Sequence, residues 1–137
     1  MKRVFLFSFI CIFIFIACKS QKKIIENDNK KNHPFCVTCI NFGSGGGFAN
    51  SFQSYTLYSN GKLVGNGHIL KQVSSESLVS IFNLADSIHE SYIAPGNTYQ
   101  FVNIISDSDS IYCSWQYGDQ TIDTKITILY DKLKKIL

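Results

Sequence analysis

Cys36 and Cys39 have the spacing with the clearest chemical potential in this chain of 137 residues. A CxxC pair can act as a redox couple or provide half of a zinc site. The chain has no second CxxC or HxxxH at a usable distance, so the other half of a zinc site is missing. The surrounding segment FCVTCINF has the composition of a strand, in which residues three apart point to opposite faces. Thiol-redox chemistry therefore stays an alternative rather than the leading prediction.

The remaining candidate catalytic groups do not form a recognisable arrangement. His33, His68 and His89 have no carboxylate at motif spacing, and the serines lie in neither a G-x-S-x-G nor an S-x-x-K motif. Asp107 and Asp109 resemble the start of a calcium loop, but the Gly and distal Glu of that loop do not follow. We expect solvated histidines, a turn at the two aspartates and a protein without catalytic residues, metal or cofactor.

A glycine-rich segment runs from Gly43 to Phe48 as GSGGGF. It differs from a P-loop because no Lys-Ser or Lys-Thr follows, and from a dinucleotide motif because Phe occupies the sixth position. One interpretation is a flexible connection between two strands. The other is a recognition loop, in which Gly45, Gly46 and Gly47 let the backbone approach a partner and Phe48 is an exposed anchor.

The N-terminus predicts export. Lys2-Arg3 precede an apolar run from Val4 to Ala17, which is shorter than the roughly 20 residues that span a bilayer but suits a signal peptide. The sequence Phe15-Ile16-Ala17-Cys18 resembles the lipobox of bacterial lipoproteins. The resemblance implies cleavage after residue 17 and acyl chains, including palmitate, on Cys18. An ordinary secretory signal is the alternative.

Residues 18–33 are polar and rich in lysine, and we expect them to form a flexible tether. From His33 onward the chain has six basic and eight acidic residues, and this mildly acidic balance argues against nucleic acid. About 105 residues remain, which suits one domain over residues 34–137. Lys19 stands where an Asp would resemble an inner-membrane retention signal, so analogy with lipoproteins favours the outer membrane.

Periodicity predicts the elements of that domain. Strand patterns cover Phe35–Phe42, Phe52–Ser59, Lys62–Leu70, Thr98–Ser106 and Ser110–Tyr117, and the glycine run should end the first of them. Asn60-Gly61 predicts a type I′ hairpin turn, with a bulge at Gly65 or Gly67. Helical spacing begins after Ser74 and again near Ile122, and places on one face of the first helix Leu78, Ile81, Phe82, Ala85 and Ile88. The predicted fold is an α+β two-layer sandwich, with an antiparallel sheet of about five strands covered by two helices in the order βββαββα.

Alternation also predicts which side chains share a face. In the last strand one face should be buried, with Ile111, Cys113, Trp115 and Tyr117. If Cys36 shares the core face of Ile40 and Phe42, a Cys36–Cys113 disulfide is possible where the two strands are neighbours, although pairings with Cys39 stay open. The aromatic side chains of the hairpin divide between two faces, so one set could lie outside as a binding surface.

The segment FGSGGGFANSFQSYTLYSNGKL is followed by an amphipathic helix, Pro95-Gly96-Asn97, Tyr99, Phe101, Trp115, Gly118-Asp119 and a closing helix with Leu129-Tyr130 and Leu133. This pattern resembles a group of small bacterial lipoproteins without assigned function. The SGGGFA segment, the Tyr99 and Phe101 strand and the closing helix are more distantly similar to emfourin-like inhibitors of thermolysin-like metallopeptidases. That similarity implies protease contact at Gly45 to Phe48.

The leading functional prediction is a lipid-anchored, non-enzymatic binding module of the bacterial cell envelope. It is attached to the membrane through acyl chains on Cys18 and binds a protein or envelope component through the glycine loop and the nearby strand edge. Inhibition of a metallopeptidase and thiol-redox activity at Cys36 and Cys39 are the alternatives.

Overall fold

The computed structural model describes residues 37–137, which form seven strands and two helices. The predicted signal peptide, Cys18, the tether, His33 and Cys36 lie outside the described residues. The elements are β1 (Val37–Gly46), β2 (Ser51–Tyr58), β3 (Lys62–Gly65), β4 (His68–Gln72), α1 (Ser75–Asp86), β5 (Tyr92–Ala94), β6 (Thr98–Ser106), β7 (Ser110–Gln116) and α2 (Thr124–Lys135).

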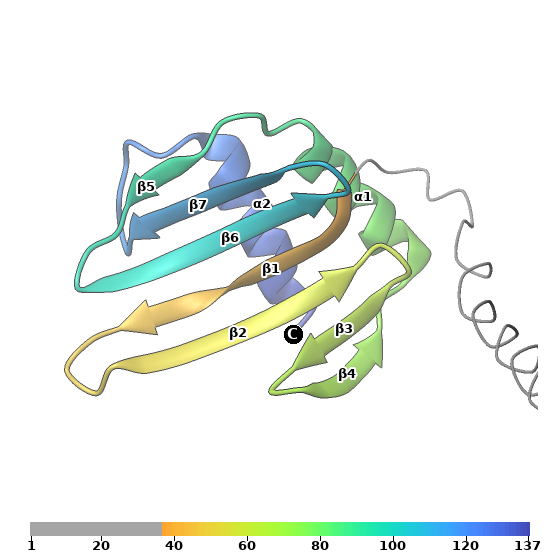
Figure 1. Cartoon of the computed structure of the whole chain (residues 1–137), viewed down its shortest axis with the longest axis horizontal. Helices are drawn as coiled ribbons and strands as arrows, with labels where there is room; N and C mark the ends of the chain where they lie inside the picture. Colours follow the sequence, from red (N-terminus) through yellow and green to blue (C-terminus); the bar gives the residue numbers. More distant parts are fainter. Residues whose placement is uncertain (1–36) are drawn as a thin grey trace, which may run out of the picture. The chain divides into compact units, whose positions relative to one another are not determined.

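The strands form one open sheet in the order β4-β3-β2-β1-β6-β7-β5. Neighbouring strands are antiparallel except β5 and β7, which are parallel. Both helices of residues 37–137 lie behind this sheet in Figure 1, and neither crosses its front. The α+β class is confirmed, but the predicted strand number and order are wrong, because the chain has seven strands in the order ββββαβββα.

The first correction concerns the glycine run, which does not end β1. The strand continues to Gly46 and pairs with β2 on one side and with β6 on the other. Pairing on both sides satisfies the backbone groups of these glycines, so the ladder offsets their weak strand propensity. The connection to β2 is only the turn Gly47 to Asn50, in which the Asn50 amide donates to the Gly47 carbonyl over 3.0 Å.

The second correction concerns the hairpins. Leu57 and Leu63 are paired and both fully buried, and a two-residue turn at Asn60-Gly61 would shift the register by one residue and expose one of them. The chain instead uses a three-residue loop, in which Gly61 has positive φ and Asn60 does not. The turn with positive φ at both central residues is Asn66-Gly67, and it splits the predicted Lys62–Leu70 strand into β3 and β4.

The third correction is β5, a strand of three residues at the sheet edge that the sequence pattern did not reveal. A side-chain cluster fixes the adjacent loop: the Tyr92 hydroxyl donates to Asp119 over 2.8 Å, and the amide and hydroxyl of Thr121 donate to the same carboxylate. The bonds from Thr121, followed by the bond from Tyr92, lower the pKa of Asp119. The Gly118-Asp119 break predicted from sequence is therefore also the attachment point of the edge strand.

The core lies between the sheet and the helices. The Ser74 side chain caps α1 by accepting from the Ser77 amide. Of the apolar stripe predicted for this helix, Ile81, Phe82 and Ala85 are buried and Leu78 is half-buried, while Ile88 is buried but follows the end of the helix at Asp86. On α2 the Tyr130 ring packs edge-on against Trp115 with centroids 5.3 Å apart, and its hydroxyl donates to the carbonyl of Gly43. Burial raises the pKa of Tyr130. No helix within residues 37–137 is long and apolar enough to cross a membrane.

The predicted faces hold with two exceptions. Cys113 and Trp115 are buried and Ile111 is half-buried, but Tyr117 is exposed because β7 ends at Gln116. In β1 the register with β6 shifts between Val37 and Cys39, so Val37 is buried together with Ile40 in spite of the odd spacing. Simple alternation therefore cannot be extended past this bulge toward the N-terminus.

Candidate functional site

The face of the sheet opposite the helices is the candidate site. We define the open face as the side chains of the four central strands that alternate with the buried core positions. In β1 and β2 they are Cys39, Asn41, Gly43, Gly45, Phe52, Ser54, Thr56 and Tyr58. In β6 and β7 they are Tyr99, Phe101, Asn103, Ile105, Ser110, Tyr112, Ser114 and Gln116.

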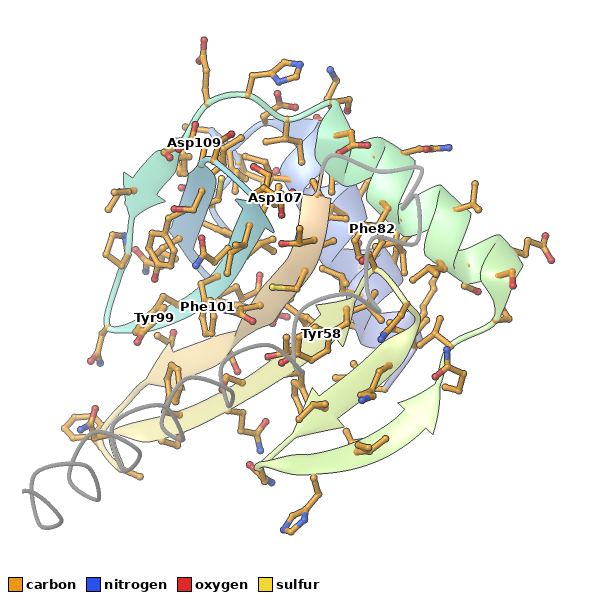
Figure 2. All side chains as sticks on the ribbon, turned by 45° about the vertical axis from the view of Figure 1, so that its right-hand side comes forward. Tyr58, Phe82, Tyr99, Phe101, Asp107 and Asp109 are labelled. Atoms are coloured by element: carbon orange, nitrogen blue, oxygen red, sulfur yellow. The ribbon has the colours of Figure 1, made fainter. Side chains whose placement is uncertain are left out.

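Four aromatic rings gather at one end of the open face, and we call them the aromatic cluster: Phe52, Tyr99, Phe101 and Tyr112. Phe52 and Phe101 are stacked, with centroids 5.6 Å apart and planes within 2°. Phe101 also stacks on Tyr112 at 6.3 Å and packs obliquely against Tyr99 at 6.5 Å. Figure 2 shows Tyr99 and Phe101 beside one another on β6, with Tyr58 farther along the sheet. Three strands thus contribute one continuous aromatic surface.

The glycines of β1 make this stacking possible. Phe101 lies opposite Gly43 and Phe52 opposite Gly45, so rings from the two neighbouring strands meet over a strand that has no side chains there. A Cβ on Gly45 would lie 2.7 Å from the Tyr99 hydroxyl oxygen and 3.2 Å from the Phe52 ring. Both glycines are consequently buried beneath aromatic side chains. Gly43 and Gly45 thus form a flat stretch of backbone on which the aromatic rings lie, and we call these two residues the glycine floor.

Beside the aromatic cluster, one row of hydrogen-bonding side chains crosses all four strands. We call it the polar row: Tyr112, Asn103, Asn41 and Thr56, which face one another in register. The Thr56 hydroxyl donates to the side-chain oxygen of Asn41 over 2.9 Å. The side-chain oxygen of Asn103 is the only buried side-chain polar atom within residues 37–137 without a hydrogen-bond partner. Such a group is costly for the fold and calls for an explanation.

The glycine loop predicted as a partner-binding site is only partly a loop. Gly45 is buried under Tyr99 and Phe52, and Gly46 is the last residue of β1. Gly47 begins the turn, where its amide donates to the carbonyl of Asn97 over 2.8 Å and ties the turn to the segment before β6. Phe48 is completely exposed at the hairpin tip. Of the four predicted residues, Phe48 alone presents a large side chain to solvent.

The described cysteines lie on opposite faces of the sheet and are both free thiols. Burial raises the pKa of Cys39, outweighing a hydrogen bond with Thr38 that lowers it, and burial also raises the pKa of Cys113. An activated redox thiol has the opposite shift. Because Cys36 lies outside the described residues, the Cys36–Cys113 disulfide stays a prediction. The prediction required the two strands to be neighbours, but β6 lies between β1 and β7.

The other predicted polar residues are dispersed. His68 and His89 are exposed, as expected. Asp107 and Asp109 lie in the β6–β7 turn (Figure 2). There the Asp109 side chain accepts from the Ser110 amide over 2.7 Å. No cluster of three metal-ligating side chains occurs between residues 37 and 137. The turn predicted at these aspartates is confirmed.

Sequence reasoning missed most of the open face. It divided the hairpin aromatics between two faces, and the structure agrees, since Phe52 and Tyr58 lie outside and Tyr55 packs against the core residue Phe42. It did not extend the same argument to β6, where Tyr99 and Phe101 alternate with the buried Val102. The available signal was the apolar character of both faces of one strand. No protein-family model and no curated protein matches this chain.

Proposed function

We propose that this protein is a lipid-anchored, non-enzymatic binding module of the bacterial cell envelope, and that the open face is its binding surface. The observation that carries the proposal is the aromatic cluster: Phe52 keeps 62% of its surface exposed and Tyr112 keeps 38%, with no element of the described chain over them. Contiguous exposed rings of this kind mark interaction sites on soluble domains. The anchor follows from the predicted acylation of Cys18.

Site-specific photocrosslinking in intact cells tests the binding surface. A photoreactive phenylalanine analogue at position 112 reports on the open face, and the same analogue at Ile128, exposed on α2, is the matched control. We expect adducts with envelope material from position 112 and far fewer from position 128. Equal yields from both positions would contradict a binding role for the open face.

The anchor is tested separately by Cys18→Ser. We expect the unaltered chain to take up radiolabelled palmitate and to sediment with membranes, and the variant to lose the label. Labelling that persists in the variant would refute acylation at this residue.

Inhibition of a thermolysin-like metallopeptidase is a second candidate, favoured by Phe48. This side chain lies at the tip of a hairpin whose turn is held by the Gly47–Asn97 and Asn50–Gly47 hydrogen bonds, and a preorganised loop loses little entropy on binding. The full chain should slow such a peptidase at stoichiometric concentration, and Phe48→Ala should relieve the inhibition. Unchanged turnover across a panel of these peptidases would remove this candidate.

A further inference from the structure

The absence of charge on the open face restricts what it can bind. None of its residues is Asp, Glu, Lys or Arg. The nearest charged groups are Lys62 of the next strand, β3, which lies beside Tyr58 on the same side of the sheet, and Asp107 and Asp109 in the β6–β7 turn, all at the end away from the aromatic cluster. A phosphate or carboxylate ligand is bound most strongly by cationic side chains, and a cationic ligand by carboxylates. An uncharged ligand matches this surface without leaving an unpaired charge.

The middle of the open face is polar, which separates it from an ordinary protein interface. Protein interfaces place apolar residues at the centre and polar residues at the rim. Here the polar row crosses the sheet between the aromatic cluster on one side and Tyr58 with Ile105 on the other. A ligand that covers this surface must bring both apolar surface and hydrogen-bonding groups to its centre.

The size of the face is another constraint. Four strands about 4.8 Å apart and about eight residues long cover about 500 Å². A chain of a few sugar rings fits within this flat area.

A sugar chain also has the required chemistry. A pyranose ring has apolar C–H surfaces that pack on aromatic rings, and its hydroxyl groups both donate and accept hydrogen bonds. The Asn41 amide and the Thr56 and Tyr112 hydroxyls offer donors and acceptors beside the exposed rings of Phe52 and Tyr112, whereas the side-chain oxygen of Asn103 is buried.

We propose that the open face binds an uncharged glycan chain of the cell envelope. Sugar rings pack on the aromatic cluster, with Phe52 and Tyr112 as the exposed contacts, and their hydroxyls bond with the polar row. This inference rests on the proposed function and adds the chemical class of the ligand to it.

The test uses the full chain in detergent, with binding measured by affinity electrophoresis and calorimetry. The neutral probes are an N-acetylglucosamine hexamer, a neutral glucan and a neutral mannan, and the charged comparators are polygalacturonate and chitosan. We expect binding to at least one neutral probe. Phe52→Ala and Tyr112→Ala should each weaken it at least about threefold and together about tenfold, as expected for lost aromatic contacts.

Tyr117→Ala is the matched control, because this tyrosine follows β7, is 73% exposed and lies outside the open face. It should leave affinity within about twofold. Circular dichroism of each variant confirms that the fold is retained. Binding that the open-face variants leave unchanged, or equal binding of charged comparators, would overturn the proposal.

The failure of this inference can be told apart from that of the proposed function. If no neutral probe binds but crosslinking at position 112 still yields envelope adducts, the glycan class is wrong and the binding module stands. If position 112 yields no adducts and no probe binds, both are wrong.

Discussion

The two faces of the central sheet are built from the same four strands and differ in almost every other respect. The covered face holds aliphatic side chains such as Ile40 and Leu57 together with the rings of Phe42 and Trp115, all nearly inaccessible beneath α1 and α2. The open face holds aromatic rings, amides and hydroxyls, and among its side chains Phe101 and Ser114 are buried only by their neighbours within the sheet. Packing against helices explains the residue types of the first face and not those of the second.

The difference between the two faces corresponds to a difference in role: the covered face stabilises the fold, and the open face is available for binding. A side chain on the covered face contributes through burial, while an exposed ring on the open face contributes little to folding and is free to contact a ligand. The residue types of the open face therefore need an explanation other than packing in the core. Substitutions on matched positions of the two faces can test this separation.

The largest expected contrast is between Phe42→Ala and Phe52→Ala. Phe42 on the covered face is 1% exposed, so its truncation leaves a cavity and should cost ~3–5 kcal/mol of unfolding free energy. Phe52 loses mainly its stacking on Phe101, which should cost ~0.5–1.5 kcal/mol. Urea unfolding of the full chain, followed by circular dichroism, measures both. Equal losses of unfolding free energy would show that the two faces contribute equally to the stability of the fold.

The glycine floor gives the next contrast. A methyl group on Gly43 would overlap the backbone carbonyl of Gln53, which cannot move without breaking the β1–β2 ladder, so Gly43→Ala should cost about 3 kcal/mol. On Gly45 the methyl group meets the side chains of Tyr99 and Phe52, which can rotate, so Gly45→Ala should cost about 1 kcal/mol. Thermal unfolding gives the order. A larger loss for Gly45→Ala would mean that the aromatic cluster is rigid.

The two faces also differ in how well sequence predicts them. Helical spacing identified the buried stripe of α1, and alternation identified the buried Cys113 and Trp115, because burial imposes a period on residue type. The open face has no such constraint. Gly43 to Gly46 appeared to end a strand because ring stacking over glycine depends on Phe52 and Phe101, two residues brought together only by the fold.

The hairpin turns differ from those predicted from the sequence for a related reason. The chain has two Asn-Gly dipeptides, each in a hairpin connection. Only Asn66-Gly67 has positive φ at both residues, because Leu57 and Leu63 must both face the core and this pairing requires a three-residue loop at Asn60-Gly61. Local turn propensity does not include this requirement, because it comes from the packing of Leu57 and Leu63 in the core. Strand β5 was missed since three residues carry no readable period and depend on pairing with β7.

Asn103→Val should stabilise the protein by about 1 kcal/mol. The buried side-chain oxygen of Asn103 has no partner within the described chain, and a β-branched residue suits the strand, so the substitution removes a desolvation cost. Chemical unfolding measures the gain. If the polar row binds a glycan, the same variant should bind the neutral probe more weakly. A variant that loses stability would show that Asn103 has a structural role in the open face.

The smallest perturbation of the fold comes from thiol labelling, since Cys39 lies on the open face and Cys113 on the covered face. Cys39 is half-buried and should react with iodoacetamide in the native protein, whereas the buried Cys113 should react only at the rate of unfolding. Because burial raises the pKa of Cys39, less thiolate is present at pH 8 than for free cysteine, so its rate should be lower there and should keep rising at more alkaline pH. Peptide-resolved mass spectrometry distinguishes the two sites. Labelling of Cys39 faster than free cysteine at pH 7 would indicate an activated thiol and would favour redox chemistry on the open face over simple binding.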